Sequence, residues 1–355
     1  MPRSAFKTEQ ATAGGGMIPS VTDAAAAWFG GRLATGLVEV TDDPASLDGQ
    51  GWWAVAHSFE GVFRAARFES VVVAPHPPGR WRGVPRTSWS TSLDEREYVK
   101  AVSSVRERIA AGDVYQANIC RVMSAPLAPG CALPGLSALL TAGNPAPYGG
   151  FVHVPELALD VATASPELYL RRRADVVESG PIKGTGRTPD DLQPKDVAEN
   201  IMIVDLVRND LSRVCEPGSV TVPHLLGLEE HPGLVHLVST VRGDLVAGTS
   251  WADLLAATFP PGSVTGAPKS SALRIIGELE TAPRDVYCGA VGWVDADAGQ
   301  AELAVGIRTF WSDGDTLRFG TGAGITWGSD PYGEWAETEL KADRLLSIAA
   351  QEAGT

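Results

Sequence analysis

Apolar and polar positions follow different patterns on the two sides of Ser92. Before this residue, short β-prone stretches at 51–63 and 68–73 alternate with turns rich in proline. This pattern predicts a small β-rich lobe over residues 17–91. Residues 1–16 are polar or small and end in three glycines, which is typical of a flexible leader.

The segment that follows Ser92 has the spacing of an amphipathic helix. Ser92 and Glu95 are arranged as a capping box, and Gly112 stands where the helix should end. The apolar residues between them recur at helical spacing: Tyr98, Val102, Val105 and Ile109. A strand is predicted directly afterwards, over residues 114–122.

Further along the chain, runs of strands are separated from helices. Residues 155–185 are predicted to be strands, and residues 285–327 an antiparallel meander. Residues 196–212 are apolar almost all round, which predicts a buried helix, and residues 334–350 predict a closing amphipathic helix. This segregation favours the α+β fold class over a Rossmann alternation, and the glycine-rich stretches fit no nucleotide-binding loop.

Charge and composition exclude several classes of function. The 355 residues include 43 acidic residues against 29 Lys and Arg, for a net charge of -14. This balance argues against nucleic acid and anionic membranes as partners. The cysteines are too widely spaced to predict a zinc site or a disulfide framework. Without a membrane-length apolar run or an apolar signal segment, the protein is expected to be cytoplasmic.

Two carboxylates lie in or beside the apolar segment of the predicted buried helix. These are Glu199 and Asp205. A buried carboxylate is costly unless it is paired, hydrogen-bonded or bound to a metal. A helix cap at Glu199 and an ion pair between Asp205 and Arg208 would account for both without any catalytic role.

The closing helix carries a second set of charges. Glu334, Glu337 and Lys341 share one face, and a solvated face with a Glu–Lys pair is the ordinary explanation of this spacing. Carboxylates from two separate helices, with no nearby His or Cys, would instead suit a hard cation such as Mg²⁺.

A lysine and a glutamate in turns are candidates for covalent chemistry. Lys183 follows a strand and precedes a glycine, and a lysine held in this way can be a nucleophile when it is neutral. Glu167, upstream in Ser-Pro-Glu, is a candidate general acid. Surface turns would explain both residues equally well.

Nine stretches, read together and in order, resemble one family. They are GDVYQANI (112–119), SPELYL (165–170), PIKGT (181–185), AENIMIVDLVRND (198–210), HLVST (236–240), PPGSVTGAPK (260–269), GIRT (306–309), GTGAGIT (320–326) and EWAETELKADRLL (334–346). The resemblance is to the chorismate-utilising enzymes, and within them to component I of the aminodeoxychorismate synthases. It implies a chorismate-binding catalytic domain over residues 92–355, with a large mixed or antiparallel core of two packed sheets flanked by helices.

The resemblance also implies how the substrate and the metal are held. Glu199 and Glu337 match ligands of a magnesium ion on the chorismate ring carboxylate, and Glu334 matches a water-mediated contact. Arg308 matches the arginine that pairs with the enolpyruvyl carboxylate. The other implied substrate contacts are Lys341, Thr185, Ser263, Gly322, Gly324 and Gln116.

Three positions decide which reaction the resemblance implies. Relatives that add water carry a lysine where Gln116 stands, and anthranilate synthases usually carry alanine in place of Lys183. The implied route is therefore attack by Lys183 with Glu167 as general acid, followed by ammonia, giving 4-amino-4-deoxychorismate for para-aminobenzoate and folate synthesis. His236 matches an active-site histidine whose role in this reaction is open.

Ammonia must come from another chain if the resemblance holds. None of the cysteines stands in a GxCxG nucleophile turn, so a separate glutamine amidotransferase subunit is the expected partner. Two alternatives stay open at this point. One is an anthranilate synthase component I that tolerates the lysine, and the other is a non-catalytic chorismate-binding subunit.

Overall fold

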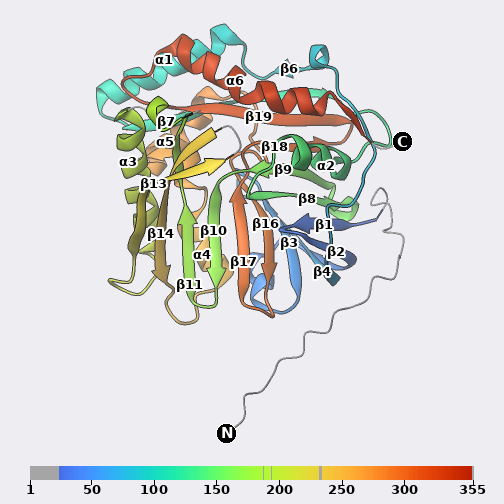
Figure 1. Ribbon diagram of the computed structural model, residues 1–355. Helices are drawn as coiled ribbons and strands as arrows, with labels where there is room; N and C mark the ends of the chain where they lie inside the picture. Colours follow the sequence, from blue (N-terminus) through green and yellow to red (C-terminus); the bar gives the residue numbers. More distant parts are fainter. Residues whose placement is uncertain (1–23, 187, 193, 232–233, 354–355) are drawn as a thin grey trace.

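The computed structural model describes residues 24–353, except residues 187, 193 and 232–233. The predicted leader, residues 1–16, lies outside the described residues. Six α-helices and a large sheet make up most of the described chain (Figure 1). None of these helices combines the length and the apolar character that crossing a membrane requires.

One hydrogen-bonded network joins eighteen strands, and every pairing in it is antiparallel. The strands follow one another as β7 (Gln116–Pro126), β19 (Thr316–Ile325), β18 (Thr309–Asp313), β9 (Leu159–Ser165), β8 (Tyr148–Val154), β1 (Ala26–Phe29), β2 (Arg32–Thr41), β4 (Phe63–Val73), β3 (Trp52–His57), β16 (Ala290–Asp295), β17 (Gln300–Val305), β10 (Leu168–Arg173), β11 (Val176–Gly180), β14 (Leu234–Asp244) and β13 (Thr221–His231). Short strands complete it: β6 (Ser90–Thr91) and β15 (Gly266–Ala267) beside β7, and β12 (Ile182–Gly186) beside β14.

The sheet folds back on itself, so that two halves enclose a common core. In Figure 1, the half from β7 to β8 runs across the half from β3 to β14. Val122 and Val152 from the first half share an apolar cluster with Val177 and Val291 from the second. The α+β prediction is confirmed. The two packed layers are connected through β1, β2 and β4, because these strands bond to both halves.

The strands before residue 92, apart from β5 (Trp81–Arg82), belong to this same sheet. β1 pairs with β8, and β3 pairs with β16. Residue 92 therefore marks a change from strands to a helix, and the hydrogen-bonded sheet continues across it.

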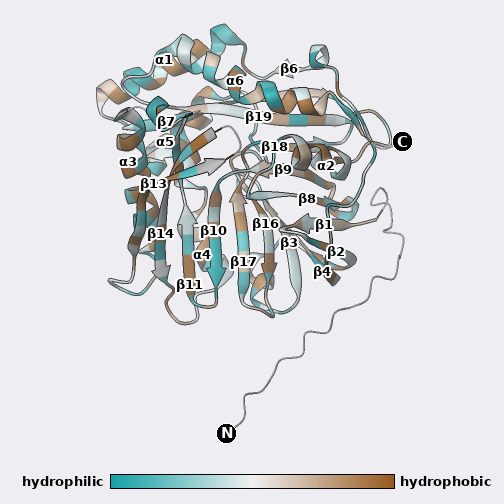
Figure 2. Cartoon of the chain, viewed as in Figure 1, coloured by the Kyte–Doolittle hydropathy of each residue, from teal (hydrophilic) through white to brown (hydrophobic). Residues whose placement is uncertain are grey.

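Helices cover the outside of both halves. α1 (Glu95–Ala111), α2 (Leu133–Gly143), α5 (Lys269–Leu279) and α6 (Pro331–Ala349) pack on the half that contains β7, while α3 (Pro194–Leu211) packs on β14 and α4 (Trp251–Thr258) on α3. Figure 2 shows polar and apolar segments along α1 and α6, as expected of helices with one buried face. β5 and β20 (Glu352–Ala353) form a separate two-stranded sheet, which pairs residues 352–353 with residues 81–82.

The helix predicted after Ser92 is α1, but its capping box is formed by other residues. Asp94 is the N-cap and exchanges hydrogen bonds with Glu97, while Gly112 ends the helix in a left-handed conformation as predicted. Ser92 instead accepts a hydrogen bond from Val122 N at 2.9 Å, so the sheet uses its hydroxyl group.

Replacing Asp94 by alanine should lower the free energy of unfolding by about 1 kcal/mol, because the backbone N–H of Glu97 loses its partner. Urea unfolding followed by circular dichroism measures this change. Ser92→Ala, on the boundary predicted from the sequence, should not shorten α1. A larger loss of helix in Ser92→Ala than in Asp94→Ala would contradict this assignment of the cap.

The helix predicted over 196–212 is α3, and it is buried on one face only. Ile203 and Val204 are buried, whereas Val197 and Ile201 are 37% and 42% exposed. The prediction of burial all round was therefore wrong, because α3 lies on the outside of β14. The expected ion pair between Asp205 and Arg208, which gives Asp205 no catalytic role, is confirmed. Asp205 Oδ1 lies 2.9 Å from Arg208 Nη1, and both side chains are exposed.

The predicted meander over 285–327 is in fact two hairpins. β16 pairs with β17, and β18 pairs with β19, but β17 bonds to β10 and β18 to β9. The chain crosses from one half of the sheet to the other between Gly306 and Arg308. This crossing brings both halves to one place, and several of the candidate residues lie around it.

Candidate active site

Lys183 and Gln116 meet at Gly324, although β12 and β7 belong to different halves of the sheet. Gly324 stands opposite Asn118 in the pairing of β19 with β7. A Cβ atom at Gly324 would collide with the amide nitrogen of Gln116 and would lie 3.3 Å from Lys183 Nζ. A residue without a side chain therefore leaves space for the lysine amine beside the glutamine amide.

Glu167 lies next to this lysine and is 4% exposed. Burial raises the pKa of its carboxyl group to about 7, against a hydrogen bond with Ser263, the charge of Lys183 and the N–H of Ile182, which lower it. A carboxyl group with this pKa is substantially protonated near neutral pH. It can therefore donate a proton to a leaving group.

The segments that carry Glu167 and Arg308 are locked together by their backbones. Val305 N donates to Glu167 O at 3.0 Å, and Ala164 N donates to Arg308 O at 3.0 Å. Arg308 adopts φ 52°, a left-handed conformation that is unfavourable for a residue with a side chain. Burial lowers the pKa of Arg308, and its guanidinium group has no carboxylate partner within the described residues. Such an arginine suits an anionic ligand.

Lys341 reaches from α6 to the strand that carries the glycines. Its Nζ lies 2.6 Å from Glu337 Oε1 and donates to Gly322 O at 3.1 Å. The Lys341 and Glu337 side chains are 50% and 43% exposed. The ion pair is therefore weak and can rearrange when a ligand arrives.

Glu334 and Glu337 lie on the same side of α6. Glu334 is 6% exposed. Burial raises the pKa of Tyr98, and the negative charges of Glu334 and Glu337 raise it further, so both glutamates lie near this ring. Across the described residues, no group of three or more His, Cys, Asp or Glu side chains is close enough to hold a metal ion. Glu199, Glu334 and Glu337 therefore do not form a closed group of three ligands, and a cation held by Glu199 and Glu337 would need further oxygen ligands from water and a bound anion.

Glu199 lies on the turn of α3 that is attached to β14. Its neighbour Asn200 accepts a hydrogen bond from Ser239 Oγ at 2.5 Å and donates one to a main-chain carbonyl of β14 at 3.1 Å. On the same strand, His236 is 2% exposed and stands in register with Thr185 of β12.

The predicted residues thus form groups of unequal size. Direct contacts or strand register join the following sets: Lys183, Glu167, Ser263, Gln116 and Gly324; Lys341, Glu337 and Gly322; Thr185 and His236. Arg308 joins the first set through the backbone of the segment before Glu167.

Sequence reasoning missed two features beside the site. Asn118 links Gln116 to Ser263 through hydrogen bonds of 3.3 and 3.0 Å, and it lies in the stretch GDVYQANI without having been singled out. The buried ion pair between Arg284 and Glu280, at 2.6 Å, carried no signal, because four-residue spacing is common on solvated helices.

The arrangement suits a small anionic substrate. It combines a carboxyl group that can donate a proton, a lysine amine beside it and a desolvated arginine. A family model described as chorismate binding enzyme matches residues 50–347. The chain belongs to this family.

Relatives within the family have two different names. The chain is 40% identical over 278 residues to anthranilate synthase component 1 of Streptomyces coelicolor, covering 73% of this chain and 52% of that protein. It is 38% identical over 272 residues to aminodeoxychorismate synthase component 1 of Klebsiella aerogenes, covering 73% and 59%. The chain therefore spans about half the length of the curated relatives it matches.

The fold is that of solved structures in the same class. Anthranilate synthase component I from Streptococcus pneumoniae TIGR4 superposes with a TM-score of 0.77 at 22% identity, covering 95% of each chain. This likeness extends over both halves of the sheet and supports the architecture described above.

Proposed function

We propose that this chain is component I of an aminodeoxychorismate synthase, which replaces the 4-hydroxyl group of chorismate by an amino group. One observation carries the proposal: Lys183 Nζ lies at Gly324 beside an amide side chain, with the protonatable Glu167 next to it. Alanine in place of Lys183, or lysine in place of Gln116, would instead favour the reactions of other family members.

Lys183 and Glu167 together account for every bond and proton in the proposed reaction. Lys183 attacks ring carbon 2, both conjugated ring double bonds shift by one position, and the 4-hydroxyl group leaves as water with the proton of Glu167. Ammonia then attacks carbon 4, and the electrons of the carbon 2–lysine bond return to Lys183 as a neutral amine. The new ammonium group gives a proton to the Glu167 carboxylate, which restores the acid for the next turnover.

Cationic side chains account for binding the dianionic substrate despite the net charge of -14. Arg308 presents a desolvated guanidinium group that matches a carboxylate in shape, and Lys341 can leave Glu337 for the second carboxylate. Main-chain N–H groups near Gly322 and Gly324 are further candidate donors, because glycine permits close approach.

Magnesium fits the donor chemistry of this chain. Mg²⁺ takes one or two protein carboxylates and completes its shell with water and substrate oxygens. Glu199 and Glu337 would hold it, with Glu334 acting through water. When bound, the ion would neutralise the ring carboxylate.

Replacing Glu337 or Glu199 by glutamine should raise the magnesium concentration for half-maximal activity by about tenfold or more, because each change removes one charged ligand. Magnesium titrations of activity and calorimetric binding both measure this change. Glu95→Gln, on the exposed side of α1, is the matched control. An unchanged magnesium dependence in both variants would rule out this ligand set.

The decisive experiment supplies chorismate, magnesium and ammonium, and identifies the product by mass. 4-Amino-4-deoxychorismate supports the proposal, and a fluorescent anthranilate product contradicts it. Anthranilate synthase component I is the second candidate, because a relative with that name is 40% identical. Binding of chorismate without any turnover would indicate the third candidate, a non-catalytic subunit.

Ammonia is proposed to come from a partner glutamine amidotransferase subunit. Three of the four cysteines are buried, and none stands in a nucleophile turn. The purified chain should therefore use ammonium but not glutamine, and glutamine should become a substrate when an amidotransferase subunit is added. Efficient glutamine use by the chain alone would overturn this part of the proposal.

A further inference from the structure

The side-chain oxygen of Gln116 is buried without a donor. Gln116 is 0% exposed, and its Oε1 has no hydrogen-bond partner in the part of the chain that the structure describes. A buried carbonyl oxygen in this state is unfavourable unless a ligand supplies an N–H or O–H group.

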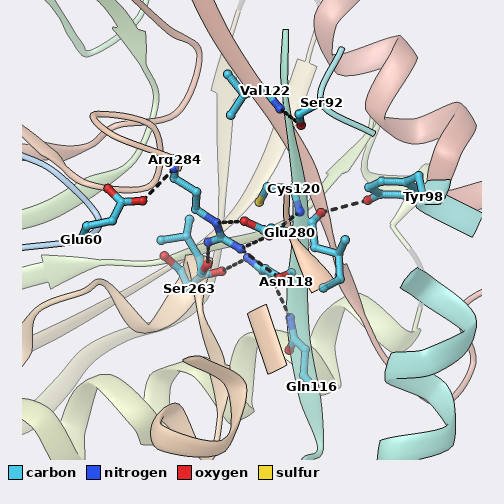
Figure 3. Close-up of polar contacts among 12 residues, drawn as sticks. Glu60, Ser92, Tyr98, Gln116, Asn118, Cys120, Val122, Ser263, Glu280 and Arg284 are labelled. Carbon is cyan, nitrogen blue, oxygen red and sulfur yellow. Dashed lines mark hydrogen bonds and ion pairs between the residues drawn. The ribbon is translucent and has the colours of Figure 1, made fainter. Parts of the chain in front are cut away.

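Asn118 dictates which way this oxygen faces. A main-chain carbonyl can only accept, so Asn118 must present Nδ2 to Ser263 O, 3.0 Å away. Its Oδ1 then faces Gln116 and accepts from Nε2 at 3.3 Å. The orientation of both amides follows from an acceptor that cannot be reversed. We call this chain of hydrogen bonds, from Ser263 O through the Asn118 amide to the Gln116 amide, the relay. Figure 3 shows its two side chains, with Gln116 at the end.

A buried ion pair holds the base of the relay. Arg284 donates to the main-chain oxygens of Asn118 at 3.0 Å and Val264 at 2.9 Å, and its Nη2 lies 2.6 Å from Glu280 Oε1 (Figure 3). The Arg284 and Glu280 side chains are 1% and 7% exposed. These bonds fix β7 relative to the loop that carries Ser263, so the amide of Asn118 has little freedom to turn.

The chemistry of a nitrogen nucleophile matches the acceptor that this relay presents. Ammonia attacks carbon with its lone pair, and its N–H bonds point away from that carbon. Positive charge develops on nitrogen as the bond forms, and a carbonyl oxygen behind it stabilises that charge. The same amide oxygen is too weak a base to take the proton that an attacking water must lose.

We propose that Asn118 is a positioning residue for the nitrogen nucleophile, holding Gln116 Oε1 as the hydrogen-bond acceptor for ammonia. The proposal rests on the proposed function in one respect, namely that ammonia is the second substrate. It does not depend on whether ammonia attacks carbon 4 or carbon 2. Asn118 acts through Gln116 and does not itself touch the reacting atoms.

The test measures KM for ammonium and KM for chorismate separately in Asn118→Leu and Gln116→Met. Leucine and methionine keep the approximate volume but remove the amide. Both variants should show a rise of about tenfold or more in KM for ammonium, with an unchanged KM for chorismate. The double variant should be no worse than the poorer single variant, because the two residues act as one unit.

Ser92→Ala is the matched control, because it removes one hydrogen bond to the same strand, at Val122 N, away from Gln116. It should leave KM for ammonium unchanged. If Asn118→Leu does not fold, Gln116→Met alone decides. A rise in KM for chorismate instead, or a fall in melting temperature with unchanged KM values, would overturn the proposal. Failure of the proposed function is recognised independently from the wild-type product, because anthranilate, or no product at all, would then replace 4-amino-4-deoxychorismate.

Discussion

Replacing Lys183 by alanine should lower the rate of 4-amino-4-deoxychorismate formation by roughly 10³-fold or more, even at saturating ammonium. The variant loses the nucleophile, and with it the covalent route to carbon 4. It also gains space beside Gly324, where the amine lies 3.3 Å from the position of a Cβ atom. We therefore expect some 2-amino product or anthranilate to appear. Product analysis by mass and fluorescence measures both changes.

Two comparison variants separate the nucleophile from its charge. Lys183→Arg keeps a positive charge but cannot form the adduct, so it should be as inactive at carbon 4 as the alanine variant. Lys100→Ala removes an exposed lysine from α1 and should have no effect. Unchanged formation of the 4-amino product by Lys183→Ala would mean that this lysine only lines the pocket.

Replacing Glu167 by glutamine should lower turnover by about 10²–10⁴-fold, because the departing hydroxyl group loses its proton donor. In the wild-type enzyme, the acid is present below a pKa of about 7 and lost above it. The rate should therefore fall by about tenfold per pH unit on the alkaline side. That dependence should be absent from the residual activity of Glu167→Gln. A variant rate with the same alkaline decline as wild type would exclude Glu167 as its source.

The same carboxyl group predicts an effect on stability that does not depend on activity. Its pKa is raised from 4.5 to about 7 by burial, so ionisation opposes folding. The penalty is absent below about pH 4.5, grows between these values and is complete above pH 7. Relative to wild type, Glu167→Gln should gain about 3 kcal/mol of unfolding free energy between pH 5 and pH 8. Urea unfolding at both pH values measures this, and an equal difference at both would show that Glu167 ionises freely.

Local features of the chain could be predicted because neighbouring residues produce them. The left-handed Gly112 that ends α1 and the ion pair of Asp205 with Arg208 each involve residues a few positions apart. The sequence predicts the N-cap at Ser92, two residues before the actual N-cap, Asp94. Several polar residues near the start of a helix can serve as caps, and local sequence does not distinguish them. Asp94 is the cap because the Ser92 hydroxyl group instead accepts a hydrogen bond from Val122 N of β7.

Motif order also allowed the family to be predicted from sequence. The nine stretches lie within or overlap the region that the family model matches, residues 50–347. The same stretches supplied the candidate residues, but not their contacts. Relatives with both names match the chain, so which carbon accepts the amine is a matter for product analysis.

By itself, the sequence determined the fold class, the positions of α1, α3 and α6, and the family, since periodicity and motif order are properties of the chain. The tertiary structure alone decided that the strands form one folded sheet, with two hairpins where a meander was expected. It also decided that Lys183 lies beside Gln116 at Gly324 and that burial raises the pKa of Glu167 to about 7. The physical reason is the same in each case: pairing across the two halves of the sheet and loss of water depend on distant residues, which local sequence patterns do not report.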